Sequence, residues 1–143
     1  LRGGDAPMSE RGKIHNRVQA QQIRDFSGLR YGKITPTDID AFFEFGDSVF
    51  IYIELKYGGA SLPTGQRMAL ERQCDRVCKG GGNAYLLVAS HKVPPDEDIV
   101  AHVQPVTAVY HEGKWGQAAE GWTLKRMIDW ILEKHNMLGA ASG

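Results

Sequence analysis

The sequence predicts an α/β protein in which a small mixed β-sheet is flanked by helices, in the order α-β-β-α-β-β-α. Two neighbouring runs, Ile39–Phe45 and Val49–Lys56, are rich in β-branched and aromatic residues and are separated by a short turn, which is typical of a hairpin. A helical segment over about Thr64–Lys79 ends at three glycines and leads into an apolar strand at Ala84–Ala89. Elements that alternate in this way form a sheet with helices on its faces.

The remaining elements lie before and after this central region. A first helix is expected over Lys13–Phe26, where Ser27 and Gly28 end it. A further strand is expected around Val103–His111, and Thr123 is placed to cap a last amphipathic helix. The apolar residues of that helix keep helical spacing: Leu124, Met127, Ile128, Ile131 and Leu132. We expect Trp115, Trp122 and Trp130 to close the core against it.

Length and composition indicate one intracellular globular domain. The 143 residues are 42% hydrophobic and 24% charged, and 17 basic residues balance 17 acidic ones, which argues against a protein held on nucleic acid by bulk charge. We expect one domain over residues 9–138, with a fusion remnant or disordered tail at 1–8 and a flexible tail at 139–143. Without a signal-peptide pattern or a long apolar run, no membrane association and a cytoplasmic location are expected.

Two carboxylates are brought together by the predicted hairpin. Three turn residues, 46–48, match the apolar faces of the two strands, and counting back from them places Asp40 across from Glu54 and Asp38 across from Lys56. Opposed side chains lie about 5 Å apart at Cβ, a distance at which two like charges need compensation. Oxygen ligands suit Mg²⁺ or Mn²⁺, and a lysine ammonium beside such an ion is what phosphodiester hydrolysis requires.

The same acidic residues can also simply decorate a solvated sheet face. The context favours a site, because the acidic pair interrupts strongly apolar strands in which a structural position more often carries Thr or Val. Cys74 and Cys78, one helical turn apart, are read as reduced helix residues rather than metal ligands, and the five histidines show no metal-ligand spacing.

The chain carries, in order, Asp38-Ile39-Asp40, the turn, Ile53-Glu54-Leu55-Lys56 and a following helix with Gln66. In these motifs it resembles the PD-(D/E)xK nuclease superfamily, over about residues 13–91. The resemblance implies a restriction-endonuclease-like core and a Mg²⁺ (or Mn²⁺) ion held by Asp40, Glu54 and the Leu55 carbonyl. It implies that Lys56 positions or activates water and that Gln66 contacts that water or a substrate phosphate. Asp38 is the alternative ligand or a supporting partner. Many members carry a Glu in the first helix where this chain has Gln21 and Gln22, so the number of metals stays open.

These features favour a metal-dependent deoxyribonuclease that leaves 5′-phosphate products. A chain this short favours recognition of DNA structure, such as a branch, junction or end, over sequence, and symmetric cleavage of a branch favours a homodimer. Candidate DNA contacts are Arg17, Gln21 and Arg24 on the first helix and Arg67 on the second. The alternatives are a nuclease-like module that binds nucleic acid or a protein without cutting, and an unrelated α/β scaffold.

Overall fold

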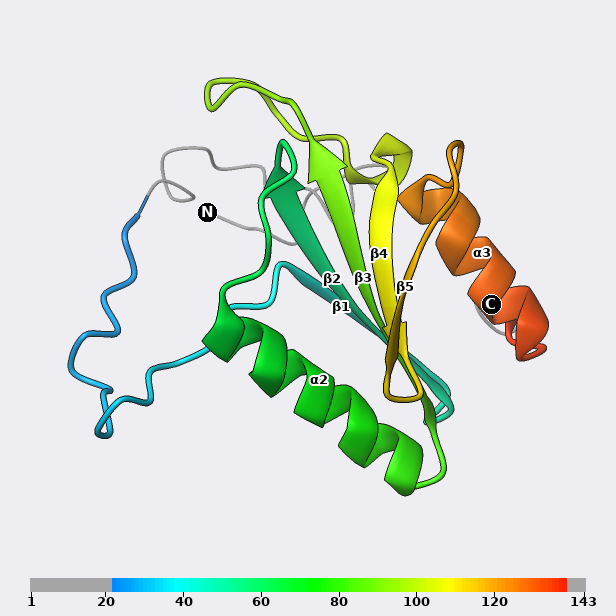
Figure 1. Cartoon of the computed structure of the whole chain (residues 1–143), viewed down its shortest axis with the longest axis horizontal. Coiled ribbons are helices and arrows are strands. Elements are labelled where there is room, and N and C mark those ends of the chain that lie inside the picture. The colour runs from blue at the N-terminus through cyan, green and yellow to red at the C-terminus, as the bar shows by residue number, and fades with distance from the viewer. Residues whose placement is uncertain (1–21, 139–143) are drawn as a thin grey trace, which may run out of the picture. The chain divides into compact units, whose positions relative to one another are not determined.

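The computed structural model describes residues 22–138 (Figure 1). Its elements in chain order are β1 (Ala41–Phe45), β2 (Val49–Tyr57), α2 (Thr64–Lys79), β3 (Asn83–His91), the 3₁₀ helix η3 (Ala101–Val103), β4 (Val106–His111), β5 (Lys114–Gln117) and α3 (Leu124–Lys134). The described residues therefore form a mixed α/β fold, as the sequence predicts. The particular restriction-endonuclease-like order, which includes a first helix, stays a prediction.

The chain divides into two compact units after Pro36. In the described part of the first unit, residues 22–36, the backbone forms no helix, and a bridge joins Tyr31 to Ile34. The helix expected over Lys13–Phe26 is therefore wrong for residues 22–26. Ile23 is 93% exposed, so the apolar packing that stabilises short helices is missing there. Residues 13–21 lie outside the described residues.

The second unit contains the sheet and both long helices. Its strands lie in the order β1-β2-β3-β4-β5, and every neighbouring pair is antiparallel except β2 and β3, which are parallel and joined by α2. The predicted hairpin register is confirmed, because Phe42 pairs with Tyr52. The turn fits this register through positive φ angles at Gly46 (55°) and Asp47 (57°). The single domain expected over residues 9–138 stays a prediction.

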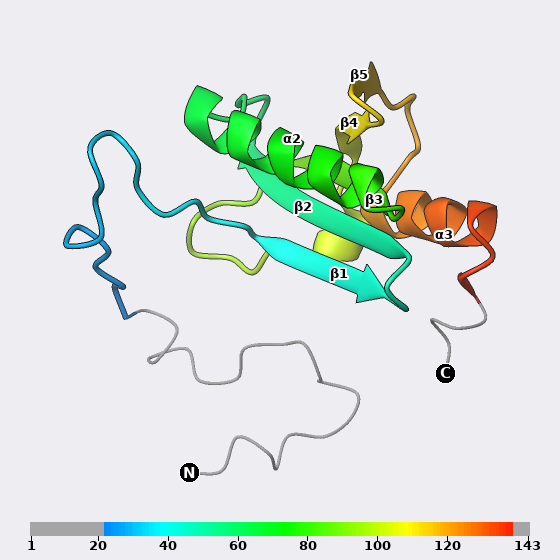
Figure 2. The ribbon, with the colours of Figure 1, turned by 90° about the horizontal axis from the view of Figure 1, so that it is seen from below.

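The sheet separates two halves of the core, each covered by one helix (Figure 2). On one face Leu70 and Cys74 of α2 pack against Tyr52 and Leu86. The opposite face carries α3, whose buried side chains pack against Ile51, Ile53, Tyr85 and Leu87. Cys74 and Cys78 are free thiols on α2, as expected. Burial raises the pKa of Cys74 to about 12, so this thiol stays protonated near neutral pH.

Three details differ from the sequence prediction. The strand expected from Val103 begins at Val106, after η3, and the short edge strand β5 was not expected. Trp122 packs against the core beneath α3, but Trp130 is 46% exposed. Trp115 lies on the α2 side, where its ring contacts Tyr110 and its Nε1 donates to Glu71 (2.6 Å). The expectation that all three tryptophans close the core against the last helix is therefore wrong for Trp115 and Trp130.

Candidate active site

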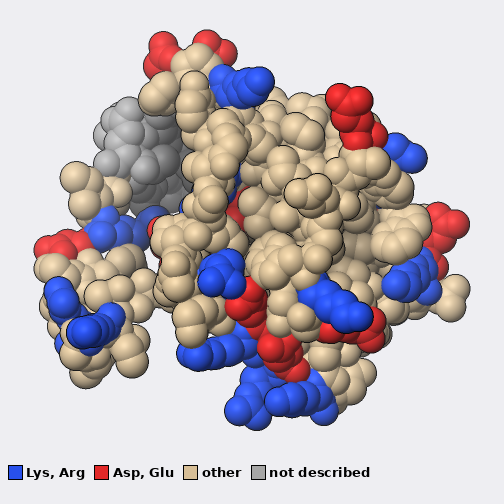
Figure 3. Space-filling model, in the orientation of Figure 1, with Lys and Arg blue, Asp and Glu red and all other residues tan. Residues whose placement is uncertain are grey.

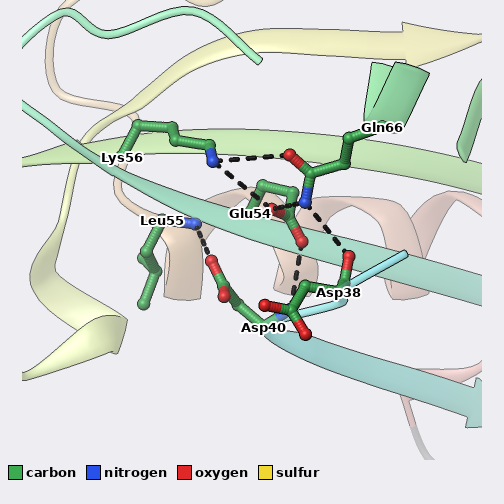
Figure 4. Close-up of polar contacts among 6 residues, drawn as sticks. All are labelled: Asp38, Asp40, Glu54, Leu55, Lys56 and Gln66. Atoms are coloured by element: carbon green, nitrogen blue, oxygen red, sulfur yellow. Dashed lines mark hydrogen bonds and ion pairs between the residues drawn. The ribbon is translucent and has the colours of Figure 1, made fainter. Parts of the chain in front are cut away.

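The candidate residues meet where three segments converge: the chain entering β1, the carboxyl end of β2 and the first turn of α2 (Figure 4). Asp38 and Asp40 precede β1, Glu54 and Lys56 lie on β2, and Gln66 lies on α2. Alternation along β2 turns Glu54 and Lys56 toward the face that α2 covers. The helix crossover from β2 to β3 thus brings Gln66 back over the two side chains that precede it.

Glu54 is the buried centre of the site. Its side chain is 1% exposed and accepts hydrogen bonds from the Asp40 backbone N–H (3.0 Å to Oε2) and from Gln66 Nε2 (2.7 Å to Oε1). Burial raises the pKa of Glu54, and the Asp40 carboxylate adds to this effect, whereas the two hydrogen bonds and Lys56 oppose it. The site therefore contains a carboxylate that is withdrawn from water and accepts one hydrogen bond at each of its two oxygens.

Asp40 and Glu54 are joined through each other's backbone. The Leu55 backbone N–H donates to Asp40 Oδ2 (2.7 Å), while the Asp40 backbone N–H donates to Glu54. These two bonds continue the β1–β2 pairing beyond its last regular pair, Ala41 with Ile53. The proximity of Asp40 and Glu54 predicted from the turn is therefore confirmed.

Gln66 links the lysine to the acidic residues. Its Oε1 accepts from Lys56 Nζ (3.4 Å), and its Nε2 donates to the Asp38 carbonyl (3.1 Å) as well as to Glu54. Lys56 Nζ also lies 3.9 Å from Glu54 Oε1, and its side chain remains 23% exposed. The ammonium group is thus held beside the carboxylate and is still reachable from solvent.

Asp38 contributes to this network through its backbone. Its carbonyl accepts the Gln66 amide, which fixes the amide's orientation between strand and helix. The sequence suggested Asp38 as an alternative ligand or a supporting partner, and the carbonyl contact is a supporting one. No side-chain pattern indicates such a backbone acceptor, so this part of the site could not be read from the sequence.

Among the described residues, Arg67 is the one candidate DNA contact that belongs to the same unit as this site. Arg17 and Gln21 lie outside the described residues, and Arg24 is an exposed residue of the first unit. Arg67 forms an ion pair with Glu71 (3.0 Å). Figure 3 shows basic side chains gathered over the far end of α2, where the exposed residues include Arg72, Arg76 and Lys79.

The donor set fits a hard divalent cation in part. Within residues 22–138, no group of three or more His, Cys, Asp or Glu side chains is placed to hold a metal. Magnesium, however, commonly uses one or two carboxylates and completes its octahedron with water and substrate phosphate. Asp40 and Glu54 supply two such carboxylates, joined by the hydrogen bonds described above. The neutral donors around Glu54 leave its charge to be balanced by Lys56 and by any cation that binds.

Comparison of the chain with protein-family models, with curated proteins and with solved structures gave no match. In the part of the chain that the structure describes, no helix combines the length and the apolar character needed to cross a bilayer. The function is therefore inferred from the geometry and chemistry of Asp40, Glu54, Lys56 and Gln66.

Proposed function

We propose that this protein is a metal-dependent deoxyribonuclease. The observation that carries the proposal is the convergence on one buried carboxylate, Glu54, of a second acidic residue, a lysine and a glutamine from three different segments. A buried carboxylate beside another acid costs folding free energy, and groups perturbed in this way cluster at functional sites. The resemblance to PD-(D/E)xK nucleases gives the same residues the same roles.

Asp40 and Glu54 would hold Mg²⁺ or Mn²⁺, with the Leu55 carbonyl as a further oxygen donor. When bound, such an ion polarises the phosphate and activates water. The Glu54 carboxylate is held in place before the ion arrives, because Gln66 and the Asp40 backbone N–H fix both of its oxygens. This preorganisation lowers the reorganisation needed for catalysis.

Lys56 would stabilise negative charge on the substrate. Its ammonium is oriented by Gln66 Oε1 and by Glu54 Oε1, so it is available at a defined point of the site. A positive charge fixed in a partly desolvated site acts more strongly than one in water. Gln66 positions both Lys56 and Glu54 and so couples the cationic group to the acidic pair.

The DNA would be recognised by its structure, as a branch, junction or end, and cleavage would leave 5′-phosphate products. A homodimer would supply the two sites that symmetric cleavage of a branch requires.

The test is a cleavage assay with labelled linear, single-stranded, flapped and four-way DNA in Mg²⁺ or Mn²⁺. We expect metal-dependent cutting by the wild type and its loss in Glu54→Ala and Lys56→Ala. Glu133→Ala and Lys125→Ala, which remove exposed residues of α3, serve as matched controls and should cut normally. No cutting of any DNA by a folded wild-type protein would refute the catalytic proposal.

One observation favours a second candidate, a nuclease-like module that binds nucleic acid or a protein without cutting it. Both oxygens of Glu54 already accept hydrogen bonds from neutral groups, so the pocket is satisfied without a metal ion. DNA binding that needs no divalent cation, persists in Glu54→Ala and never leads to product would select this candidate.

A further inference from the structure

Two aromatic side chains end the parallel strands beside the candidate active site. Tyr57 is the last residue of β2 and directly follows Lys56, and it pairs in register with His91, the last residue of β3. Because β2 and β3 are parallel, both carboxyl ends lie at the same edge of the sheet. Neither ring has a role in the network around Glu54.

Tyr57 combines high exposure with a fixed position. Its side chain is 62% exposed, and its ring meets the His91 ring edge-on at a centroid distance of 5.6 Å. The Val93 backbone N–H donates to His91 Nδ1 (3.1 Å), which fixes the imidazole orientation and leaves the ring proton on Nε2.

Both backbone polar groups of Gly58, the residue after Tyr57, are hydrogen-bonded to β3. The Gly58 N–H donates to the His91 carbonyl (2.7 Å), and Ser90 Oγ donates to the Gly58 carbonyl. Gly58 has a φ of 61°, which turns the chain away immediately after the tyrosine. Tyr57 therefore lies at a backbone position held by β2 and β3, and its ring keeps accessible surface.

An exposed aromatic ring such as Tyr57, next to a lysine proposed to contact phosphate, can stack on a nucleobase. Aromatic side chains stack on bases without regard to sequence, but a base must be unpaired to be reached. Successive side chains of a strand point to opposite faces, so Lys56 and Tyr57 flank the sheet edge. A DNA strand crossing this edge can present a phosphate to Lys56 and the adjoining base to Tyr57.

We propose that Tyr57, braced by His91, stacks on an unpaired base next to the phosphate that is cut, so that the substrate class is DNA with unpaired nucleotides at the cleavage point. This inference rests on the proposed nuclease function. The inference narrows the proposed substrates from branched, junction or end DNA in general to those that offer an unpaired base at the cleavage site.

The first test is fluorescence of flapped DNA in which 2-aminopurine replaces each unpaired position in turn, with the fully paired duplex as comparison, both with and without Mg²⁺. Stacking quenches this base, so we expect quenching by the wild type and by Tyr57→Phe and its loss in Tyr57→Ala. Trp130→Ala, which removes an exposed aromatic ring of α3, is the matched control and should quench normally. Absence of quenching by the wild type, or equal quenching by Tyr57→Ala, would overturn the inference.

The second test is cleavage. We expect Tyr57→Ala to lower kcat/KM roughly 10-fold or more on flapped DNA and to leave the slower cleavage of paired duplex unchanged. An equal loss on both substrates would contradict a stacking role. Failure of the wild type to cut would refute the nuclease function alone, because the quenching experiment still reports on Tyr57.

Discussion

Asp40 and Glu54 show how two carboxylates coexist inside a hairpin. Each accepts a backbone N–H from the other's segment, which supports its negative charge, and Lys56 Nζ lies a further 3.9 Å from Glu54 Oε1. Glu54, however, is buried, and that burial raises its pKa. The hydrogen bonds therefore allow the two carboxylates to lie together in the folded hairpin, and their remaining negative charge is one that a bound cation would balance.

The first residue-scale prediction concerns the metal. We expect Mg²⁺ to raise the Tm of the wild type and to have little effect on Asp40→Asn. Asparagine keeps an oxygen that accepts the Leu55 N–H but loses the charge that attracts the ion. For a domain near 100 residues, each kcal/mol of binding free energy raises Tm by roughly 4–8 °C.

The measurement is a thermal unfolding scan with and without Mg²⁺. Asp129→Asn is the control, because Asp129 pairs with Lys125 on α3, away from the site. An equal Mg²⁺-dependent shift in wild type and Asp40→Asn would show that Asp40 does not hold the ion.

Gln66 gives the second residue-scale prediction. Gln66→Ala removes the donor to Glu54 and the acceptor for Lys56, so we expect kcat/KM for DNA cleavage to fall by about 10–100-fold, the range seen when groups that orient metal ligands are lost. Gln73→Ala, on the same helix two turns later, should cleave nearly as the wild type does. Comparable activity of the two variants would refute a positioning role for Gln66.

At the residue scale, the sequence predicts which residues lie opposite each other in the hairpin, because the length of the turn sets the strand register. Asp40 and Glu54 are close because three turn residues set the register. The double role of the Gln66 amide depends on how α2 is rotated over the sheet, and this is decided by the packing of Leu70 and Cys74 rather than by any local pattern. The Asp38 carbonyl is likewise a matter of tertiary structure.

Among the elements, α3 begins at a capping residue. Thr123 accepts a hydrogen bond from the Arg126 backbone N–H (3.2 Å), as the sequence predicts for an N-cap. We expect Thr123→Ala to lower the free energy of unfolding by about 1 kcal/mol, measured by urea denaturation. Thr123→Ser keeps the hydroxyl and should lose less; equal losses would show that the methyl group, not the cap, matters.

The contact between β3 and the end of α3 gives a pH-dependent prediction. Tyr85 OH and His135 Nε2 share a hydrogen bond (2.7 Å), and the pKa of His135 is lowered by burial and by the nearby Lys134 and His111, against the opposing effect of Glu112. A folded-state pKa below the unfolded value means that the unfolded chain binds more protons. The contribution of neutral His135 to the free energy of unfolding is therefore present above the unfolded-state pKa and is lost as the pH falls through the folded-state pKa.

We expect the Tm difference between wild type and His135→Gln to shrink when pH is lowered from about 8 to about 5, across the ordinary pKa of histidine. His102→Gln, which changes an exposed histidine of η3, is the control and should show no such trend. A difference that stays constant with pH would contradict the assignment of this effect to His135.

The elements that the sequence misses have weak local signals. β5 covers only Lys114–Gln117, contains a glycine and is exposed along its length, so it has no alternation to detect. The expected helix fails at residues 22–26 because helical spacing alone does not stabilise a segment whose Ile23 is 93% exposed. By contrast, α2 has the predicted bounds, because glycines mark its end and its apolar face meets the sheet.

At the scale of the second unit, the sheet divides the core into two halves. Both halves stabilise the fold, but only the half beneath α2 also supports the candidate active site. Leu86 and Leu87 are adjacent and fully buried, but Leu86 packs beneath α2, which carries Gln66, and Leu87 packs beneath α3. The pattern of alternating apolar residues predicts the two faces. Which helix covers which face is set by the connection through α2 between the parallel strands β2 and β3, a connection whose hand in proteins is almost always right-handed.

This division leads to the last prediction. Leu86→Ala and Leu87→Ala should each lower the free energy of unfolding by about 2–5 kcal/mol, because each leaves a cavity in a close-packed half of the core. At a temperature where both variants remain folded, Leu86→Ala should cleave DNA more slowly, since α2 and Gln66 lose their support, whereas Leu87→Ala should retain wild-type kcat/KM. Urea denaturation and single-turnover cleavage measure the two effects separately. Equal losses of activity would mean that the site depends on the whole core and not on the face that α2 covers.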